Sequence, residues 1–98
     1  MDQREPQTIK ARSYVIEGRV QGVGFRAFVC RQADQLGVTG EVWNRSDGFV
    51  EAHAEHLDES VLDRFESLLQ RGPGRVDRVI SQSAAARGFS RFSVGSTR

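Results

Sequence analysis

Apolar residues recur along the chain with one of two periods. In residues 25–36 and 61–69 they recur at three- and four-residue steps, which is the period of an amphipathic helix. Around Val50, Ala52 and Ala54, apolar and polar residues alternate, which is typical of a strand with one buried face. The strands predicted by the pattern are 13–20, 40–45, 49–54, a segment through 76–80, and 89–94.

Turn and cap residues indicate where these elements begin and end. Gly37 is placed to end the first helix, Asp47-Gly48 supplies the positive φ of a tight hairpin, and Asp58 or Ser60 can cap the second helix. The resulting order is β-α-β-β-α-β. It predicts an α+β, ferredoxin-like sandwich, in which an antiparallel sheet carries two helices on one face and leaves the other face open to water.

We interpret residues 13–98 as one domain preceded by a tail. Residues 1–12 are polar and show no period, so we expect a mobile N-terminal tail. In the first strand, Ile16 and Val20 share the predicted core face, whereas Glu17 lies on the other face. A chain of 98 residues is within the size of one domain and can bury one core.

The composition excludes several classes of function. Fourteen basic and 13 acidic residues give a net charge of +1, so we expect no nucleic acid and no membrane as partner. Lys10 is the only lysine and lies in the polar tail, which argues against Schiff-base chemistry. Cys30 is the only cysteine, which fits a reducing compartment, and no apolar run is long enough for a signal peptide or a membrane span. We predict a cytoplasmic protein and expect a monomer.

A glycine-containing loop connects the first strand to the first helix within the sequence Gly-Arg-Val-Gln-Gly-Val-Gly-Phe-Arg of residues 18–26. Glycines let backbone N–H groups point into a concavity, and a helix N-terminus adds unpaired N–H groups and the positive end of the helix dipole. Arg26, in the first turn of the helix, carries a planar fork of donors that matches phosphate oxygens. The loop therefore predicts an anion site.

This loop sequence resembles the first signature of the acylphosphatase family. The sequence Gly-Glu-Val-Trp-Asn-Arg-Ser-Asp-Gly-Phe-Val of residues 40–50 is similar to the second signature, Gly-x-Val-x-Asn followed by Asp-Gly-x-Val. The resemblance extends from Tyr14 to about Val94 and implies that loop amides cradle the substrate phosphate while Arg26 holds phosphoryl oxygens. The loop residues concerned are Val20, Gln21, Gly22, Val23, Gly24 and Phe25.

Asn44 is the second residue that we single out. It has the parity of Val42 on the second strand, so its side chain is expected to face the helices. A buried amide is unfavourable unless it is paired, and the residues alone leave two interpretations open. The side chain either satisfies the backbone of the neighbouring turn, or orients a water molecule, since an amide both donates and accepts. The resemblance implies the second role.

The resemblance also implies a reaction. It predicts an acylphosphatase that hydrolyses the carboxyl-phosphate anhydride of acyl phosphates to carboxylate and inorganic phosphate. Arg26 and Asn44 would be its catalytic residues, with no metal, no cofactor and no phosphoenzyme. The carboxylate leaving group has a conjugate acid with a pKa of about 4, so it can depart without a strong general acid.

Other reactive side chains receive structural interpretations. His53, Glu51 and Glu55 are predicted to share an exposed strand face, and two-residue spacing makes their side chains diverge, so we interpret them as solvated residues rather than metal ligands. Cys30 has no histidine placed to act with it and is interpreted as a small core residue. Trp43 is expected to make packing or surface contacts on the open face of the sheet.

Two other functions are compatible with this element order. One is a non-catalytic ferredoxin-like module that binds anions or regulates, since acylphosphatase-like domains also occur inside larger hydrogenase-maturation proteins. The other is an RNA-recognition domain, which shares the element order but needs exposed aromatic residues on its central strands and a basic face. The first strand offers Val15, Glu17 and Arg19 on its open side instead. The presence of both Arg26 and Asn44 favours the enzyme.

Overall fold

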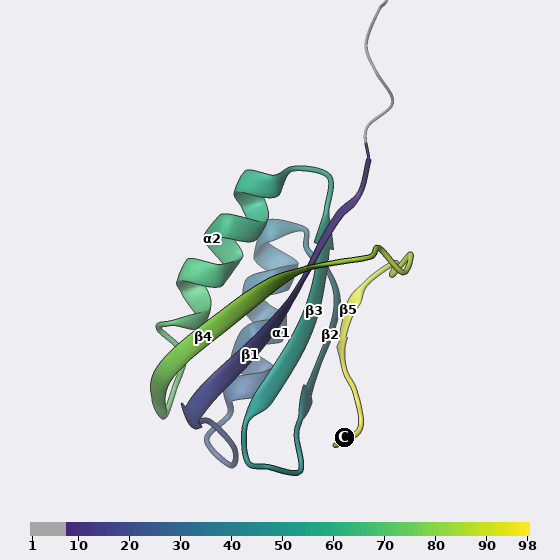
Figure 1. Ribbon diagram of the computed structural model, residues 1–98. Helices are drawn as coiled ribbons and strands as arrows, with labels where there is room; N and C mark the ends of the chain where they lie inside the picture. The colour runs from purple at the N-terminus through teal and green to yellow at the C-terminus, as the bar shows by residue number, and fades with distance from the viewer. Residues whose placement is uncertain (1–7) are drawn as a thin grey trace, which may run out of the picture.

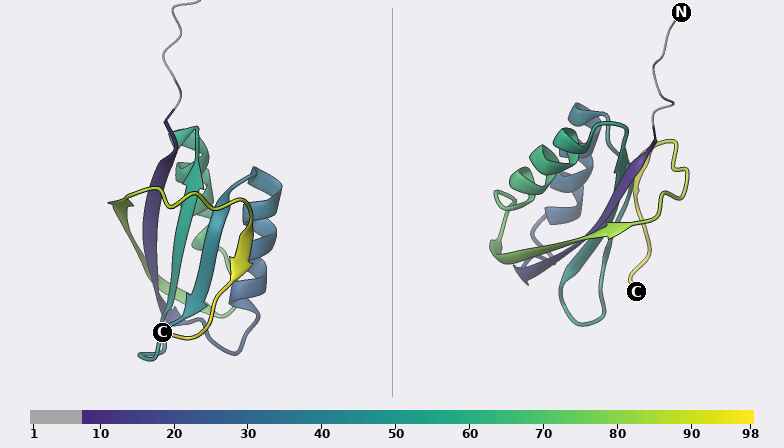
Figure 2. Two further views of the ribbon diagram at one scale, coloured as in Figure 1. Left: turned by 90° about the vertical axis from the view of Figure 1, so that its right-hand side faces the viewer. Right: turned by 45° about the horizontal axis from the view of Figure 1, so that its top comes forward.

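The computed structural model describes residues 8–98 as a five-stranded sheet with two helices packed on one face (Figure 1). The elements in chain order are β1 (Lys10–Arg19), α1 (Phe25–Leu36), β2 (Thr39–Asn44), β3 (Val50–His56), α2 (Glu59–Leu69), β4 (Arg75–Ala84) and β5 (Phe92–Val94). Figure 2 shows the two helices side by side against the same face of the sheet. The predicted α+β, ferredoxin-like architecture is confirmed.

The sheet is mixed rather than antiparallel throughout, so the predicted strand directions are wrong at one edge. Its strand order is β4-β1-β3-β2-β5, and β5 pairs with β2 in parallel, whereas all other pairs are antiparallel. The reason lies in residues 85–91, which we call the strap. The strap crosses the face of the sheet that carries no helix and delivers the chain to the opposite edge in the direction of β2 (Figure 2).

Several strand ends differ from the prediction, among them those of β1 and β5. Strand β1 begins at Lys10, not at residue 13, and its first residues pair with both neighbouring strands, as Ala11 does with Glu55 and Ala84. Part of the predicted mobile tail, 1–12, is therefore strand, and residues 1–7 lie outside the described part of the chain. Strand β5 is shorter than predicted, because the backbone N–H groups of the strap bind a side chain instead of a neighbouring strand.

The core lies between the sheet and the two helices. Both helices have the predicted caps: Gly37 ends α1 with φ 71°, and the Asp58 side chain accepts from the Ser60 amide at the start of α2. Tyr14 of β1 is fully buried, donates to the Leu62 carbonyl at 3.2 Å, and its burial raises its pKa to about 12. The other large buried side chains are Ile16, Val20, Phe25, Val29, Val42, Val50, Phe65 and Leu69.

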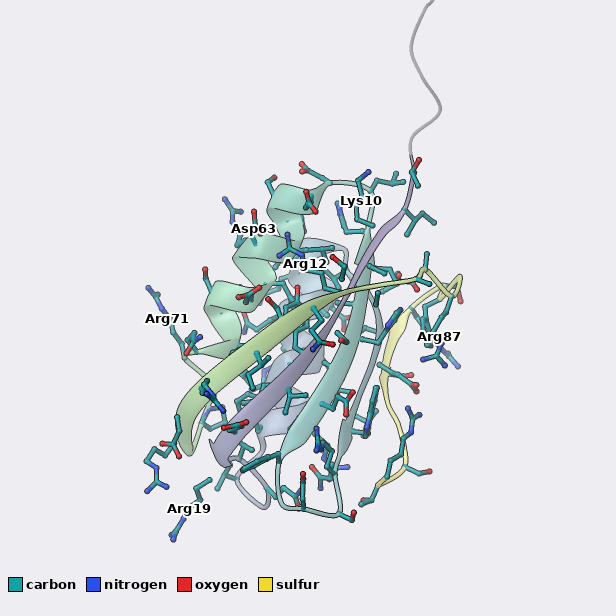
Figure 3. The ribbon with its side chains drawn as sticks, viewed as in Figure 1. Lys10, Arg12, Arg19, Asp63, Arg71 and Arg87 are labelled. Carbon is teal, nitrogen blue, oxygen red and sulfur yellow. The ribbon has the colours of Figure 1, made fainter. Side chains whose placement is uncertain are left out.

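One ion pair fixes β1 to α2 on the helix side. The guanidinium of Arg12 lies 2.7 Å from the carboxylate of Asp63, and Figure 3 shows the two side chains reaching toward each other. Glu59 and Glu66 of the same helix lie within 4 Å of Arg12 as well. The Arg12 side chain is mostly buried, so this group of charges is less screened by water than an ordinary surface pair.

The strap covers part of the face opposite the helices, which corrects the prediction of an open face at His53 and Glu55. Their exposed fractions are only 5% and 1%, because the strap lies over them. The Glu55 carboxylate accepts from three consecutive strap amides, those of Arg87 at 2.5 Å, Gly88 at 3.2 Å and Phe89 at 3.2 Å. It also lies 2.7 Å from Nε2 of His53, so the carboxylate is fully hydrogen-bonded despite its burial.

Trp43 lies on this covered face too. Its ring is 7% exposed, and the guanidinium of Arg98 stacks over it at 4.0 Å from the ring centroid. Arg98 also pairs with Glu41 at 2.8 Å. Trp43 therefore packs beneath the last residues of the chain and offers no exposed surface for a base to stack on.

The Glu55 contacts predict how stability depends on pH. Burial alone raises the pKa of Glu55, but hydrogen bonds from Arg87, His53 and Phe89 outweigh it and hold the pKa below its ordinary value. The carboxylate therefore stabilises the fold above its unfolded pKa of about 4.3, and this contribution is lost as pH falls through the lower folded pKa. We expect Glu55→Gln to lower the free energy of unfolding at pH 7 by about 1–3 kcal/mol.

Urea unfolding followed by circular dichroism between pH 2 and 7 measures this effect. The loss of stability between about pH 4.3 and pH 2 should be shallower in Glu55→Gln than in the parent. Glu51→Gln is the matched control, because Glu51 is on the same face of β3 but only half-buried. Equal slopes in the parent and Glu55→Gln would contradict the assignment.

Candidate active site

The predicted site residues gather at one end of the sheet. Residues 20–24 leave the end of β1 and turn into α1, and the β2–β3 turn and the C-terminus lie at the same end (Figures 1 and 2). Gly22 and Gly24 have φ of 72° and 82°, in the left-handed region. A Cβ at either position would meet no atom within 4 Å, so it is the backbone conformation that requires glycine here.

The loop and the first turn of α1 present a row of backbone N–H groups. Among the described residues, none of the N–H groups of 21–27 donates a backbone hydrogen bond, and Gly24 provides no side-chain cap. The first amide with a backbone acceptor is that of Phe28, which donates to the Gly24 carbonyl at 3.1 Å. Unpaired donors and the positive end of the helix dipole therefore coincide, which favours an anion.

A hollow of about 260 Å³ opens at this helix N-terminus. The residues that line it are Val20, Gly22, Gly24, Phe25, Arg26, Ala27 and Val94. It thus brings Arg26 together with four of the predicted loop residues, and neither the lining nor the first turn of α1 contains an acidic residue. Val94 comes from β5, and no local pattern in the sequence indicates its place here, because that place depends on parallel pairing with β2.

Two predicted loop residues do not line the hollow. The Gln21 side chain instead donates to the backbone carbonyls of Arg45 at 2.8 Å and Phe49 at 2.9 Å. It therefore ties the loop to the β2–β3 turn. The side chain of Val23 is partly exposed and lies near Gly74 at the start of β4.

Asn44 is the last residue of β2 and lies on the helix side of the sheet, on the same face as Val42. Its backbone is held between two neighbours, since it pairs with Val50 and its carbonyl accepts from the Arg98 amide at 2.9 Å. Asn44 does not line the Arg26 hollow. Val42 lies two residues before Asn44 on the same face of β2. The strand partner of Val42 is Val94, which does line the hollow.

The Asn44 side chain has an unusual feature. Its Oδ1 is buried and accepts no hydrogen bond from the described residues. A buried acceptor of this kind is rare and requires an explanation. The turn backbone does not satisfy it, which removes support from the structural interpretation of Asn44 that the sequence left open.

A larger hollow of about 390 Å³ lies on the other side of the loop, between the end of β1, the β2–β3 turn and the start of β4. Both of its arginines are poorly placed for a ligand. Arg75 pairs with Asp77 at 2.9 Å, and Arg19 projects away from the protein (Figure 3). We therefore favour the smaller hollow, where Arg26 and the free N–H groups coincide.

Other chemistry receives no support from the described residues. Burial raises the pKa of the Cys30 thiol, whereas a nucleophilic cysteine needs a lowered pKa. Within residues 8–98, no three His, Cys, Asp or Glu side chains come together as a metal site would require. No helix in the same range is long and apolar enough to cross a membrane.

Together, the fold and the loop define a small α+β protein with a candidate anion site between a strand and a helix N-terminus. The family model of acylphosphatases matches residues 12–94. An acylphosphatase of Bacillus licheniformis is 43% identical over 83 residues, which cover 82% of this chain and 91% of the relative. The chain therefore belongs to the acylphosphatase family and is an enzyme of this kind, so the family implies an acyl phosphate substrate and a phosphate product.

Solved structures agree with this assignment. An acylphosphatase from Coxiella burnetii superposes with a TM-score of 0.85 at 31% identity, and the match covers 97% of this chain and 100% of that one. HypF from T. kodakarensis superposes with a TM-score of 0.78 at 31% identity. The match covers 91% of this chain but only 12% of HypF, so a similar fold also forms a small part of a much larger protein.

The hydrogen bonds of Gln21 generate a testable prediction. Gln21→Ala removes the two side-chain hydrogen bonds to the Arg45 and Phe49 carbonyls, which then keep only their backbone donors, and should lower the free energy of unfolding by about 1–2 kcal/mol. Gln21→Glu should be worse, since it places a carboxylate against two carbonyl oxygens. Both variants should bind inorganic phosphate more weakly, because the loop is no longer fixed to the turn.

Thermal unfolding and calorimetric titration with phosphate measure the two effects. Gln35→Ala on the exposed side of α1 is the control and should change stability by less than about 0.5 kcal/mol. A Gln21→Glu variant as stable as the parent would show that these two hydrogen bonds contribute nothing.

Proposed function

We propose that this enzyme hydrolyses the carboxyl-phosphate anhydride of acyl phosphates in the hollow at the N-terminus of α1. One observation carries the proposal: Arg26 lines the same hollow as a loop and helix turn whose amides are unpaired. Backbone donors and a guanidinium together can bind three phosphoryl oxygens. In this proposal the amides of residues 20–25 and Arg26 bind the phosphoryl group.

The reaction needs few side chains. Water attacks phosphorus, the bond between phosphorus and the acyl oxygen breaks, and the carboxylate leaves with the bonding electrons. Since the conjugate acid of the leaving group has a pKa of about 4, no strong general acid is required. Phosphoryl transfer depends mainly on positioning and on stabilising charge, and fixed donors do both.

Asn44 is proposed to orient the attacking water. Its buried, unpaired Oδ1 can accept a hydrogen bond from water, and its amide group can donate one to the phosphoryl group or the water. An amide is not a base, so the water proton passes to a phosphate oxygen of the substrate. The proposed mechanism involves neither a metal, nor a cofactor, nor a phosphoenzyme, and we propose that the enzyme works as a cytoplasmic monomer.

A non-catalytic anion-binding role is the second candidate function. The match to a small part of HypF supports it, because there a similar fold belongs to a much larger protein. The coverage of the acylphosphatase relatives, 91% for that of Bacillus licheniformis, favours the enzyme. Turnover separates the two roles directly. A binding module would take up phosphate at the hollow without hydrolysing an acyl phosphate.

The deciding experiment measures release of benzoate and phosphate from benzoyl phosphate in the presence of EDTA. We expect turnover in the parent, unchanged by EDTA, and no detectable turnover in Arg26→Ala, because this variant loses the one cationic side chain that the described residues contribute to the hollow. Arg26→Ala should also weaken phosphate binding. Arg26→Lys should recover part of the phosphate affinity but little of the rate, since lysine lacks the bidentate fork.

Arg31→Ala is the matched control, because Arg31 is an exposed arginine of the same helix outside the hollow. It should keep both phosphate affinity and turnover. Near-parent turnover in Arg26→Ala would show that the site is misplaced. Loss of activity in EDTA that zinc or magnesium restores would overturn the metal-free mechanism.

Substitutions of Asn44 should separate binding from chemistry. Asn44→Ala should lower kcat by a factor on the order of 10²–10³, the usual cost of one preorganised polar contact, and leave phosphate affinity nearly unchanged. Asn44→Asp should be no better, because it places a negative charge beside a bound anion. A rate in Asn44→Asp that rises as a carboxylate ionises would instead identify position 44 as a general base.

A further inference from the structure

The buried carboxylate of Glu55 lies away from the candidate active site. It is five residues along β3 from Val50, a strand distance of roughly 17 Å. Nothing in the proposed reaction uses it. Nonetheless, a fully buried carboxylate with four hydrogen-bond partners is an unusual feature in a small domain.

Glu55 holds the strap through backbone groups alone. Three consecutive strap amides converge on its carboxylate, and Gly88, with φ 81°, gives the backbone the conformation that lets them converge. Every strap residue except Phe89 is exposed. With so little apolar burial, the strap is held mainly by this carboxylate and by the contact of Phe89 with the His53 ring at 5.5 Å, beside an ion pair at 3.9 Å between the half-exposed Arg87 and Glu41.

The strap leads directly into the active-site end of the sheet. Its last residue, Arg91, accepts from the Gly40 amide at 3.0 Å, and from there β5 runs in register along β2. Val42 pairs with Val94, which lines the hollow, and its carbonyl accepts from the Gly95 amide at 2.8 Å.

The same edge supports Asn44. Its carbonyl accepts from the Arg98 amide at 2.9 Å, so the residues after β5 hold the outer side of β2 up to its last residue. Without this edge, β3 alone would hold the end of β2 on which Asn44 lies. The position of the Asn44 side chain thus depends on the register between β5 and β2, which is set where the strap leads into β5.

We propose that Glu55 is a positioning residue for the hydrolysis: through the strap and β5 it fixes Val94 and Asn44 at the active site. The inference rests on the proposed function, because it requires that Asn44 acts in the chemical step. It assigns Glu55 no contact with substrate. In this proposal the site has two independent supports. The strap and β5 position Asn44, whereas Gln21 positions the loop that would bind the phosphoryl group.

The test compares two variants that weaken the same contact from opposite sides. Glu55→Gln removes the charge, and Gly88→Ala strains the strap at a positive φ without introducing a clash, since a Cβ there meets nothing within 4 Å. Gly37→Ala is the matched control, because Gly37 has φ 71°, its nearest contact would be at 3.8 Å, and it lies outside the strap. All variants are compared with Asn44→Ala.

Three quantities are measured at a temperature at which every variant is folded. Glu55→Gln and Gly88→Ala should each lower kcat for benzoyl phosphate by about 2–30-fold, while the dissociation constant for phosphate changes less than about twofold. The Gly95 amide should exchange with solvent faster in both variants. Their effects should not add in the double variant, because both act on one contact. Gly37→Ala should keep kcat and the exchange rate.

The outcomes distinguish the inference from the proposed function. If Asn44→Ala lowers kcat but neither Glu55→Gln nor Gly88→Ala does, the positioning role of Glu55 is wrong and the proposed role of Asn44 stands. Faster exchange at Gly95 without a change in kcat also overturns the role, because Glu55 would then support the fold alone. If Asn44→Ala keeps full kcat, the proposed role of Asn44 in the chemical step is wrong, and the positioning role of Glu55 falls with it. If Glu55→Gln does not fold, Gly88→Ala alone decides the outcome.

Discussion

The rest of the site depends on one unmet requirement of the backbone: the N–H groups of residues 21–27 have no backbone acceptor among the described residues. Glycines at 22 and 24 give the loop its left-handed turns, and α1 begins directly after it without a side-chain cap. So many free donors together, with one arginine and no acid among the described residues of the lining, favour the binding of an anion.

The fold supplies fixed supports on both sides of this place. Gln21 joins the loop to the β2–β3 turn, and β5 holds the outer side of β2 as far as Asn44. The two supports differ in kind. One is the Gln21 side chain, which donates to two carbonyls, and the other is the backbone pairing of β5 with β2, whose register begins where the strap ends. Membership of the acylphosphatase family is consistent with so few side chains, because phosphoryl transfer to water with a carboxylate leaving group requires mainly positioning and charge stabilisation.

One buried residue pair holds the strap on the face of the sheet that carries no helix. Glu55 and His53 lie beneath the strap, and their burial would be unfavourable without the strap amides. The strap, in turn, has little apolar surface of its own to hold it. Each part is therefore stable only in the presence of the other, which explains why a strand that reads as half-exposed in the sequence is buried on both faces.

The sequence determined both helices, their caps, the core face of β1 and the position of the glycine loop, because these follow from local periods and from residues with special backbone preferences. It also carried the family signatures. It could not show that β5 pairs in parallel, that Val94 lines the hollow, or that Glu55 is buried. These depend on where the strap crosses the sheet, and alternation along a strand is the same whether its polar face meets water or the backbone amides of a distant segment.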